Sequence, residues 1–298
     1  IVFGDWSSDV CSSDLIRLLT IGNSFSENAL TYLERIAQSE GAVNFLVGRA
    51  SLGGCSLEKH WNIATYTEAH PEYKTYSRGK LSAGEPVQAN LQEALVAEKW
   101  DMVTLQQVSW KSWRPETFEP WLGRLVELVG RLAPQAEILL HQTWAYRLDS
   151  PFFCEQGLSQ QLMHERIAAA YAQYSAKYGC RILPSGEAVH RARSVPGRQF
   201  RWPEETYAYR SASAPALPAQ ENSFAAGWSW AIRETPEGIP ELRLDANHLN
   251  ARGNYLAGCV WYETMTGLPT SGRTFVPDGI GTEDAAFLRQ IAHATVAG

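Results

Sequence analysis

A serine near the start of the chain and an Asp-x-x-His pair near its end are the residues that could do chemistry together. Ser24 lies in "IGNSFSE", where an apolar run stops at Gly22, and Asp245 lies three residues before His248 in "LDANHLNARGNYLAG". A serine hydroxyl is a poor nucleophile until a base takes its proton, and a histidine base needs a partner that fixes its tautomer and stabilises its charged form. The three residues could therefore form a Ser-His-Asp triad.

Both segments also have an ordinary structural interpretation. Ser24-x-x-Glu27 matches a capping box, in which the serine hydroxyl satisfies backbone donors of the following helix. Asp245 could cap the helix that follows it and leave His248 solvated, and the spacing Asp-x-x-His arises often by chance. On these two segments alone, Ser24 is either a helix cap or a nucleophile.

Two further segments offer hydrogen-bond donors. In "SLGGCSL" (51–57) the pair Gly53-Gly54 lets the backbone approach a ligand closely and expose an amide hydrogen. In "LQQVS" (105–109) the side-chain amides of Gln106 and Gln107 can donate hydrogen bonds. The alternatives are an ordinary glycine turn and polar residues at a strand end.

The elements that would position these residues follow from the hydrophobic pattern. Short apolar runs alternate with amphipathic helical patterns at about 87–95, 118–132 and 158–174, and Pro134 and Gly179 stand where two of these helices should stop. This alternation predicts an α/β fold, a three-layer α/β/α sandwich around a mostly parallel five-stranded sheet. Ligands of such sheets bind at the carboxyl ends of the strands. The predicted strands are Ile16–Ile21, Val43–Val47, Met102–Leu105, Ile138–Leu140 and Arg181–Leu183.

Two stretches depart from this pattern. Residues 197–244 are rich in Pro, Arg, Ser and aromatic residues and end in "WSWAIRETPEGIPELRL", which predicts a hairpin around a Thr-Pro-Glu-Gly turn. We expect an insertion that forms the rim of a pocket, or else a surface excursion, within a single domain at 16–298. "GDWSSDVCSSDL" (4–15) looks like a translated sequencing adapter, with a Ser/Asp-rich tail as the alternative, so 1–15 is left out of the fold prediction.

The composition limits the classes of partner. The formal charge of the 298 residues is -6, or about -3 without Asp5, Asp9 and Asp14, which favours neither nucleic acid nor anionic membranes. No apolar run is long enough to span a bilayer. The sequence leaves the oligomeric state open, and the compartment as well, on either side of a bacterial membrane. Without a C-x-x-C motif, neither a zinc site nor a disulfide framework is predicted, and buried free thiols are expected at Cys55, Cys154, Cys180 and Cys259.

In this order (serine, glycine, amide, Asp-x-x-His) the chain from Ile16 onward resembles the SGNH (GDSL-type) hydrolase superfamily, and most closely a subgroup catalogued as a domain of unknown function. The resemblance implies Ser24 as nucleophile, His248 as general base and acid, Asp245 as its partner, and the amides of Ser24 and Gly54 in the oxyanion hole. One departure is Asn23, which replaces the usual aspartate and is expected to loosen the turn.

The second departure is the missing Gly-x-Asn-Asp block. In its place "LQQVS" is similar to the Gln-Gly-Glu-Ser stretch of the sialate-O-acetylesterase branch. This likeness assigns the side-chain oxyanion donor to Gln106, with Gln107 as the alternative.

The resemblance implies an esterase that removes small acyl groups, above all acetate from a carbohydrate, without a metal or another cofactor. One alternative is a flavodoxin-like protein that binds phosphate or FMN at the turn containing Thr20 and Ser24. The other is an inactive relative that binds glycans. Candidate pocket residues are His60, Gln107, Trp144 and Trp228.

Overall fold

The computed structural model describes residues 14–79, 87–204, 206–209, 213–232, 238 and 240–298, and its central sheet has the five predicted strands. The strands run in the order β2-β1-β5-β6-β7, and all neighbours are parallel. Each predicted apolar run forms one strand, because strands between two helical layers bury both faces. The predicted fold class is confirmed. The bounds are β1 Asp14–Gly22, β2 Val43–Ser51, β5 Met102–Leu105, β6 Glu137–His141 and β7 Arg181–Leu183.

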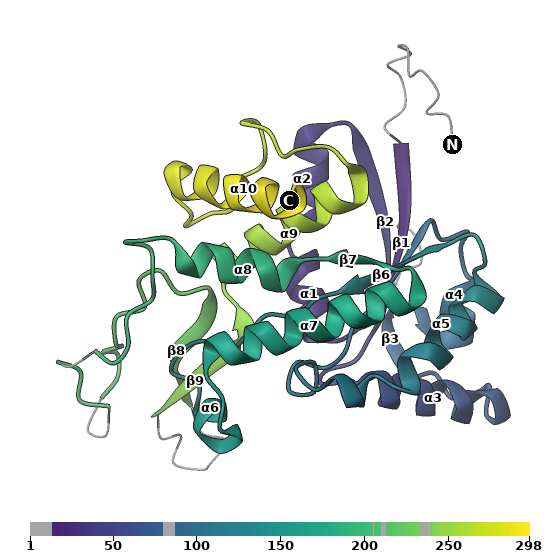
Figure 1. Cartoon of the computed structure of the whole chain (residues 1–298), viewed down its shortest axis with the longest axis horizontal. Coiled ribbons are helices and arrows are strands. Elements are labelled where there is room, and N and C mark those ends of the chain that lie inside the picture. The colour runs from purple at the N-terminus through teal and green to yellow at the C-terminus, as the bar shows by residue number, and fades with distance from the viewer. Residues whose placement is uncertain (1–13, 80–86, 205, 210–212, 233–237, 239) are drawn as a thin grey trace.

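Helices cover both faces of this sheet (Figure 1). One group packs around α9 and another around α5, while α7 runs along the edge strand β7. The first group is α1 (Ser24–Leu30), α2 (Leu33–Glu40), α8 (Ser185–Ser194), α9 (Ala251–Thr266) and α10 (Thr282–Val296); the second is α3 (Leu57–Ala69), α4 (Leu91–Val96) and α5 (Trp121–Leu132); α6 (Pro151–Gln156) and α7 (Gln160–Tyr178) complete the set.

Local sequence signals explain most helix ends. Helix α7 stops at Tyr178 because Gly179 takes a left-handed φ of 65°, and α5 stops at Leu132, as predicted. The predicted helix at 87–95 is wrong at its start: Val87 belongs to a short strand, and α4 begins after Asn90, whose side chain forms a capping box with Glu93. The short strands β3 (Tyr76–Gly79) and β4 (Val87–Ala89) pair antiparallel.

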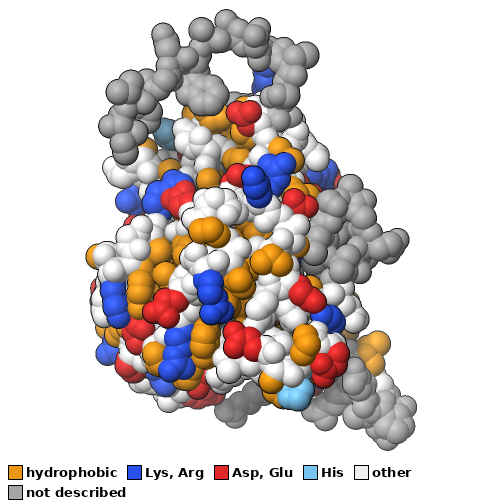
Figure 2. Space-filling view, turned by 90° about the vertical axis from the view of Figure 1, so that its right-hand side faces the viewer, with side chains coloured by type: hydrophobic (Ala, Val, Ile, Leu, Met, Phe, Trp, Pro, Cys, Tyr) orange, Lys and Arg blue, Asp and Glu red, His pale blue; other side chains and the backbone are white. Residues whose placement is uncertain are grey.

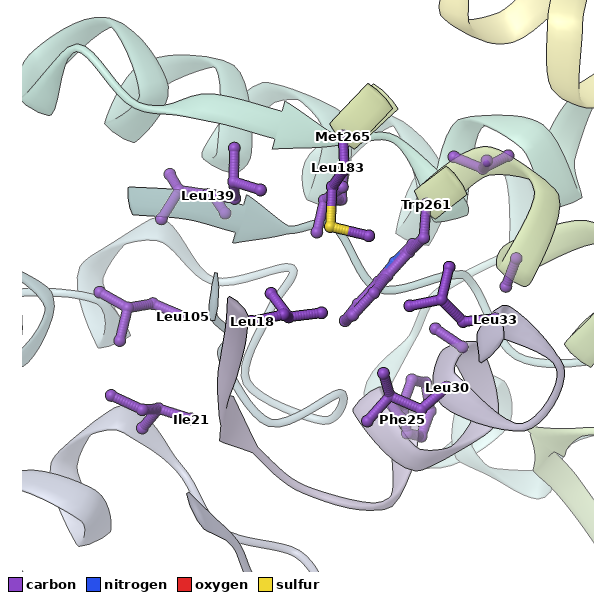
Figure 3. Packing of buried hydrophobic residues seen from close by; sticks show 14 of the residues in the cluster. Leu18, Ile21, Phe25, Leu30, Leu33, Leu105, Leu139, Leu183, Trp261 and Met265 are labelled. Atoms are coloured by element: carbon purple, nitrogen blue, oxygen red, sulfur yellow. The ribbon is translucent and has the colours of Figure 1, made fainter. Parts of the chain in front are cut away.

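Helix α9 connects the sheet to the segment that carries His248. Figure 3 shows Trp261 reaching from α9 toward Leu18 of β1, with Leu30 and Leu33 beside it. The Trp261 ring is fully buried, and burial of a large aromatic ring contributes strongly to packing. Because α9 directly follows the Asp245-x-x-His248 segment, this packing fixes that segment relative to β1.

Three strands end together at the edge where the strand order reverses. Gly22 of β1 pairs with Ser51 of β2, and Ile21 of β1 pairs with Leu105 of β5. The turns that follow these strands therefore lie at one edge of the sheet, which is where open α/β sheets bind ligands.

The predicted hairpin is present as β8 (Ala225–Ile232) and β9 (Pro240–Leu249), which pair antiparallel. Thr235, Pro236 and Glu237 of the predicted turn lie outside the described residues, as do residues 1–13 of the adapter-like stretch. Strand β1 begins at Asp14, two residues earlier than predicted.

Other surface predictions have mixed outcomes. The four cysteines within the described residues are free, but Cys154 is exposed, so the prediction of a buried thiol was wrong there. On the face that carries α3, α4 and α5, acidic, basic and hydrophobic side chains are intermixed (Figure 2). In the described part of the chain, each helix is too short or too polar to span a bilayer.

Candidate active site

Ser24, His248 and Asp245 form a continuous chain of hydrogen bonds. Ser24 Oγ lies 2.8 Å from His248 Nε2, and His248 Nδ1 lies 2.8 Å from Asp245 Oδ2. With Nδ1 protonated and donating to the carboxylate, Nε2 is free to accept the serine proton. The fold thus brings together, in the arrangement of a Ser-His-Asp triad, the three residues that the sequence singled out.

Asn23 caps the turn that carries Ser24. Helix α1 begins at Ser24, and Asn23 Oδ1 accepts a hydrogen bond from the Phe25 amide at 3.0 Å, while Asn23 Nδ2 donates to the Cys55 carbonyl at 3.0 Å. The capping-box interpretation of Ser24 is therefore wrong, and Asn23 holds the turn tightly instead of loosening it. The Ser24 hydroxyl is left to bond with His248.

Strand β9 presents His248 through a β-bulge. The β8 partner of Asp245 is Gly227 and that of Leu249 is Ala225, so β9 has two more residues than β8 between these pairs. Asp245 Oδ1 closes the bulge by accepting from the amides of Asn247 (3.1 Å) and His248 (3.0 Å). Bulges re-aim side chains in this way. The Asp-x-x-His spacing thus lets one carboxylate fix both the bulge and the imidazole.

Trp144 is buried between the segment that carries Ser24 and the segment that carries His248, and it contacts both. Its ring is 1 % exposed and stacks on Phe25 of α1 at 4.3 Å between centroids. Its indole N–H donates to the Asn247 carbonyl at 2.8 Å. Because Phe25 follows Ser24 and Asn247 precedes His248, this side chain sets the spacing between Ser24 and His248.

The hydrogen bonds between Asp245 and His248 shift the pKa values of both residues. The hydrogen bond with Asp245 raises the pKa of His248 above its ordinary value and outweighs the opposing effect of burial. Burial acts to raise the pKa of Asp245, but the hydrogen bonds from the His248 side chain and backbone lower it overall. Asp245 is therefore a carboxylate at neutral pH, and a carboxylate at this position stabilises the protonated form of His248.

Of the pair Gly53-Gly54, Gly54 has the left-handed conformation. Its φ is +60°, and a Cβ there would lie 3.0 Å from the ring of Trp110, whereas a Cβ on Gly53 would contact nothing within 4 Å. Among the described residues, no hydrogen-bond acceptor engages the amide of Ser24 or of Gly54. Both amides are available as the backbone donors that the SGNH resemblance implies.

Gln106 bonds to residues on either side of Ser24. Its Nε2 donates to Asn23 Oδ1 at 2.8 Å, and its Oε1 accepts from Ser26 Oγ at 2.6 Å and lies 3.1 Å from His141 Nδ1. The side chain is 1 % exposed and is not brought to Ser24 Oγ by any of these bonds. Since Nε2 carries a second hydrogen, the assignment of Gln106 to the oxyanion hole stays a prediction.

The structure does not place the other candidate pocket residues in a pocket. Fully buried His60 bonds to Tyr76 Oη (2.8 Å) and the Gly22 carbonyl (3.0 Å), and its burial lowers its pKa to about 4. Gln107 is also fully buried; it accepts from Leu57 and Val108 amides and donates to Thr117.

The Trp228 side chain bonds and packs with residues outside the triad. Its indole N–H donates to Asp149 Oδ2 at 3.0 Å, and its ring packs near those of Trp202 and Tyr209. Asp149 is in turn bound through two hydrogen bonds of 2.7 Å by buried Arg147. This cluster supports the hairpin that carries the Asp-x-x-His segment.

A depression of about 710 Å³ opens beside the imidazole instead. Asp245, Asn247 and His248 lie on one side of it, and the rings of Trp110, Tyr146 and Phe152 also line it. One sequence signal pointed to this depression, since Trp110 follows the Gln106-Gln107 segment in a loop after a strand. Within the described residues, no group of three His, Cys, Asp or Glu side chains could hold a metal ion.

Comparison with known proteins agrees with this fold. Residues 17–198 match the model of a domain of unknown function, DUF4886; the match ends before the hairpin with Asp245 and His248. No curated protein matches the sequence. A crystal structure of a DUF4886 family protein from Bacteroides uniformis is 25% identical, with 95% of both chains covered and a TM-score of 0.71.

A second structure, of a candidate SGNH hydrolase from Slackia heliotrinireducens, is 22% identical, with a TM-score of 0.50 over 85% of this chain and 100% of that chain. The likeness to this protein concerns the fold. The chain therefore belongs to the DUF4886 family, and it has an SGNH-like α/β fold.

Proposed function

We propose that the protein is a serine esterase of the SGNH type. The observation that carries this proposal is the hydrogen-bonded chain Ser24–His248–Asp245, with 2.8 Å at both links. In the proposed reaction, His248 Nε2 takes the Ser24 proton as Oγ attacks the ester carbonyl. The imidazolium then gives this proton to the leaving alcohol, and an acyl-enzyme remains on Ser24. Water, activated by the same imidazole, completes hydrolysis.

The amides of Ser24 and Gly54 are the proposed donors to the oxyanion. They belong to neighbouring turns at the same sheet edge, and the Gly54 turn is held to Asn23 through the Cys55 carbonyl. Fixed backbone donors stabilise the negative charge that develops on the carbonyl oxygen. Gln106 remains the proposed side-chain donor, or otherwise the residue that positions Asn23.

The proposed substrate is a small acyl ester of a carbohydrate, above all an O-acetyl ester. The support comes from the aromatic and charged lining of the depression beside His248. The likeness to the sialate-O-acetylesterase branch depends on "LQQVS" alone, and none of the comparisons adds to it, so the proposal names no particular sugar. We also propose that 16–298 is one domain with an insertion at about 197–244.

The test is hydrolysis of 4-nitrophenyl esters from acetate to octanoate. We expect activity that is highest on acetate and that is lost in Ser24→Ala and His248→Ala. Matched controls are Ser213→Ala and His70→Ala, which change exposed residues outside the triad. Activity that survives in Ser24→Ala would overturn the proposal.

The alternatives predict other results. A flavodoxin-like protein would be yellow with bound flavin after purification, and it would not need the hydrogen bond from Ser24 to His248. An inactive glycan-binding relative would leave every ester intact while still binding sugars.

A further inference from the structure

The depression beside His248 lies on one particular side of the proposed triad. His248, Asp245 and Asn247 line it, whereas the Ser24 side chain does not. In the proposed reaction, the bond from Ser24 Oγ to the acyl carbon forms while the proton moves to His248 Nε2. The bond from the acyl carbon to the leaving oxygen then breaks, and the same proton moves to that oxygen. The leaving oxygen must therefore lie next to the imidazole, and the depression is where the alcohol half of the substrate would extend.

Trp110 forms an apolar platform at this place. Its side chain is one of the few large hydrophobic ones left exposed, at 44 %, and its ring packs directly over Gly54. The loop behind it is fixed, because the Trp110 carbonyl accepts a hydrogen bond from Trp113 Nε1 at 3.0 Å. In the described part of the chain, no acceptor engages the Trp110 indole N–H. A rigid ring with a free donor thus stands between the proposed oxyanion hole and the alcohol side.

The rest of the lining adds polar groups around aromatic walls. Phe152 and Tyr146 pack edge to face at 5.0 Å between centroids, and the Tyr146 hydroxyl is 2.8 Å from Ser109 Oγ. Glu155 and Arg243 bring a carboxylate and a guanidinium to the same depression. Pockets of this kind bind a ring by its apolar face and orient it through a few polar contacts.

A sugar ring matches this lining better than a fatty alcohol does. Its C–H face can stack on an aromatic ring, and its hydroxyl edge needs donors and acceptors of the kind that Glu155 and Arg243 offer. A depression of about 710 Å³ also exceeds what an acetyl group alone would fill. We propose that the depression is a leaving-group subsite for a pyranose ring and that Trp110 is the residue on which the ring stacks. This inference rests on the proposed esterase function for the direction of the leaving group.

The experiment compares two acetate esters that share the acyl group and differ in the alcohol, 6-O-acetylglucose and ethyl acetate. In Trp110→Ala we expect kcat/KM on 6-O-acetylglucose to fall about tenfold or more, mainly through KM, because a ring stack is lost. On ethyl acetate we expect a change below about threefold, and Trp110→Phe should restore most of the loss on the sugar ester. Tyr66→Ala, which removes an exposed ring on α3, is the matched control.

Two results would overturn the inference. Equal losses of kcat/KM on the two esters would mean that Trp110 only supports Gly54. An unchanged kcat/KM on 6-O-acetylglucose would mean that the sugar ring does not stack on Trp110. Titration calorimetry with 6-O-acetylglucose on the Ser24→Ala protein, with and without Trp110→Ala, keeps the test independent of turnover. If the wild type cleaves no ester, the esterase proposal fails. Binding of 6-O-acetylglucose that depends on Trp110 would still support the subsite, and binding that does not depend on Trp110 would overturn it.

Discussion

Replacement of Asp245 by Asn tests whether the Asp-x-x-His segment acts through the imidazole tautomer. The amides of Asn247 and His248 both donate to Asp245 Oδ1, so the new amide oxygen takes that position and keeps the bulge closed. The amide nitrogen then faces His248 Nδ1, which sits 2.8 Å from the carboxylate in the wild type. Because this nitrogen donates, Nδ1 must accept, and the proton moves to Nε2, which can no longer accept from Ser24.

The expected loss in kcat is about 10⁴-fold, the magnitude found for the wrong tautomer in a serine triad. It corresponds to roughly 5 kcal/mol of transition-state stabilisation, at about 1.4 kcal/mol for each factor of ten. The assay is hydrolysis of 4-nitrophenyl acetate, with circular dichroism to check folding and Asp278→Asn, at an exposed site, as the control. A variant that keeps kcat within about threefold of the wild type would refute the role assigned to Asp245.

The pH profile gives a second readout of the same substitution. Only neutral His248 can accept the serine proton, so activity should rise as pH increases through the pKa of His248. Asp245 raises this pKa, so the activity of the wild type should fall on the acid side (the acid limb) of its pH profile at a pH above 6.5, the ordinary pKa of histidine. In Asp245→Asn the raising charge is gone and burial still lowers the pKa, so the limb of any residual activity should move to lower pH. A limb that moves upward or stays in place would contradict the assignment.

Three other predictions concern residues around the triad. Gly54→Ala should lose about 100-fold or more in kcat, because a left-handed φ and contact with the Trp110 ring displace its amide, while Gly53→Ala should stay near wild type; equal kinetics in the two variants would move the donor elsewhere. Gln106→Ala should reduce kcat by about 100-fold or more if it donates to the oxyanion, whereas a loss of thermal stability with near-normal kcat would leave it as support for the turn. His60 has a pKa of about 4 in the folded protein and near 6.5 when unfolded, so the unfolded state binds more protons between these values and stability should fall as the pH decreases from about 6.5 to about 4. Urea unfolding at pH 7.5 and at pH 5 measures this loss in the free energy of unfolding, which should be smaller in His60→Gln. A loss of the same size in both proteins would refute the role assigned to His60.

The sheet could be predicted from the sequence because each of its strands is a short apolar run that can be recognised without knowledge of the other strands. Buried parallel strands require continuous apolar runs, and five such runs separated by helical patterns leave few other arrangements. Val87 shows where periodicity failed: its spacing to Leu91 suits a helix, but the side chain of Asn90 starts the helix only at Leu91. Local capping chemistry thus overrode a hydrophobic pattern.

The candidate site could be predicted only in part, for a different physical reason. Ser24, Asp245 and His248 were found because the chemistry restricts their types and their places at strand ends. Trp144 and Trp110 could not be sorted from sequence, since both are tryptophans in loops. Trp144 is buried because its ring stacks on Phe25 of a distant element, whereas Trp110 packs over Gly54 and keeps 44 % of its surface exposed.

The replacement of aspartate by Asn23 has a physical reason in this fold. Asn23 Oδ1 accepts from Phe25 and from Gln106, while its Nδ2 donates to the Cys55 carbonyl. An aspartate could accept the first two hydrogen bonds, but it would leave the buried Cys55 carbonyl without its donor and place a charge at a site that is 1 % exposed. Asn23→Asp should therefore destabilise the turn that holds both Ser24 and Gly54. A variant with unchanged thermal stability and unchanged kcat on 4-nitrophenyl acetate would show that this side chain contributes no more than an ordinary helix cap.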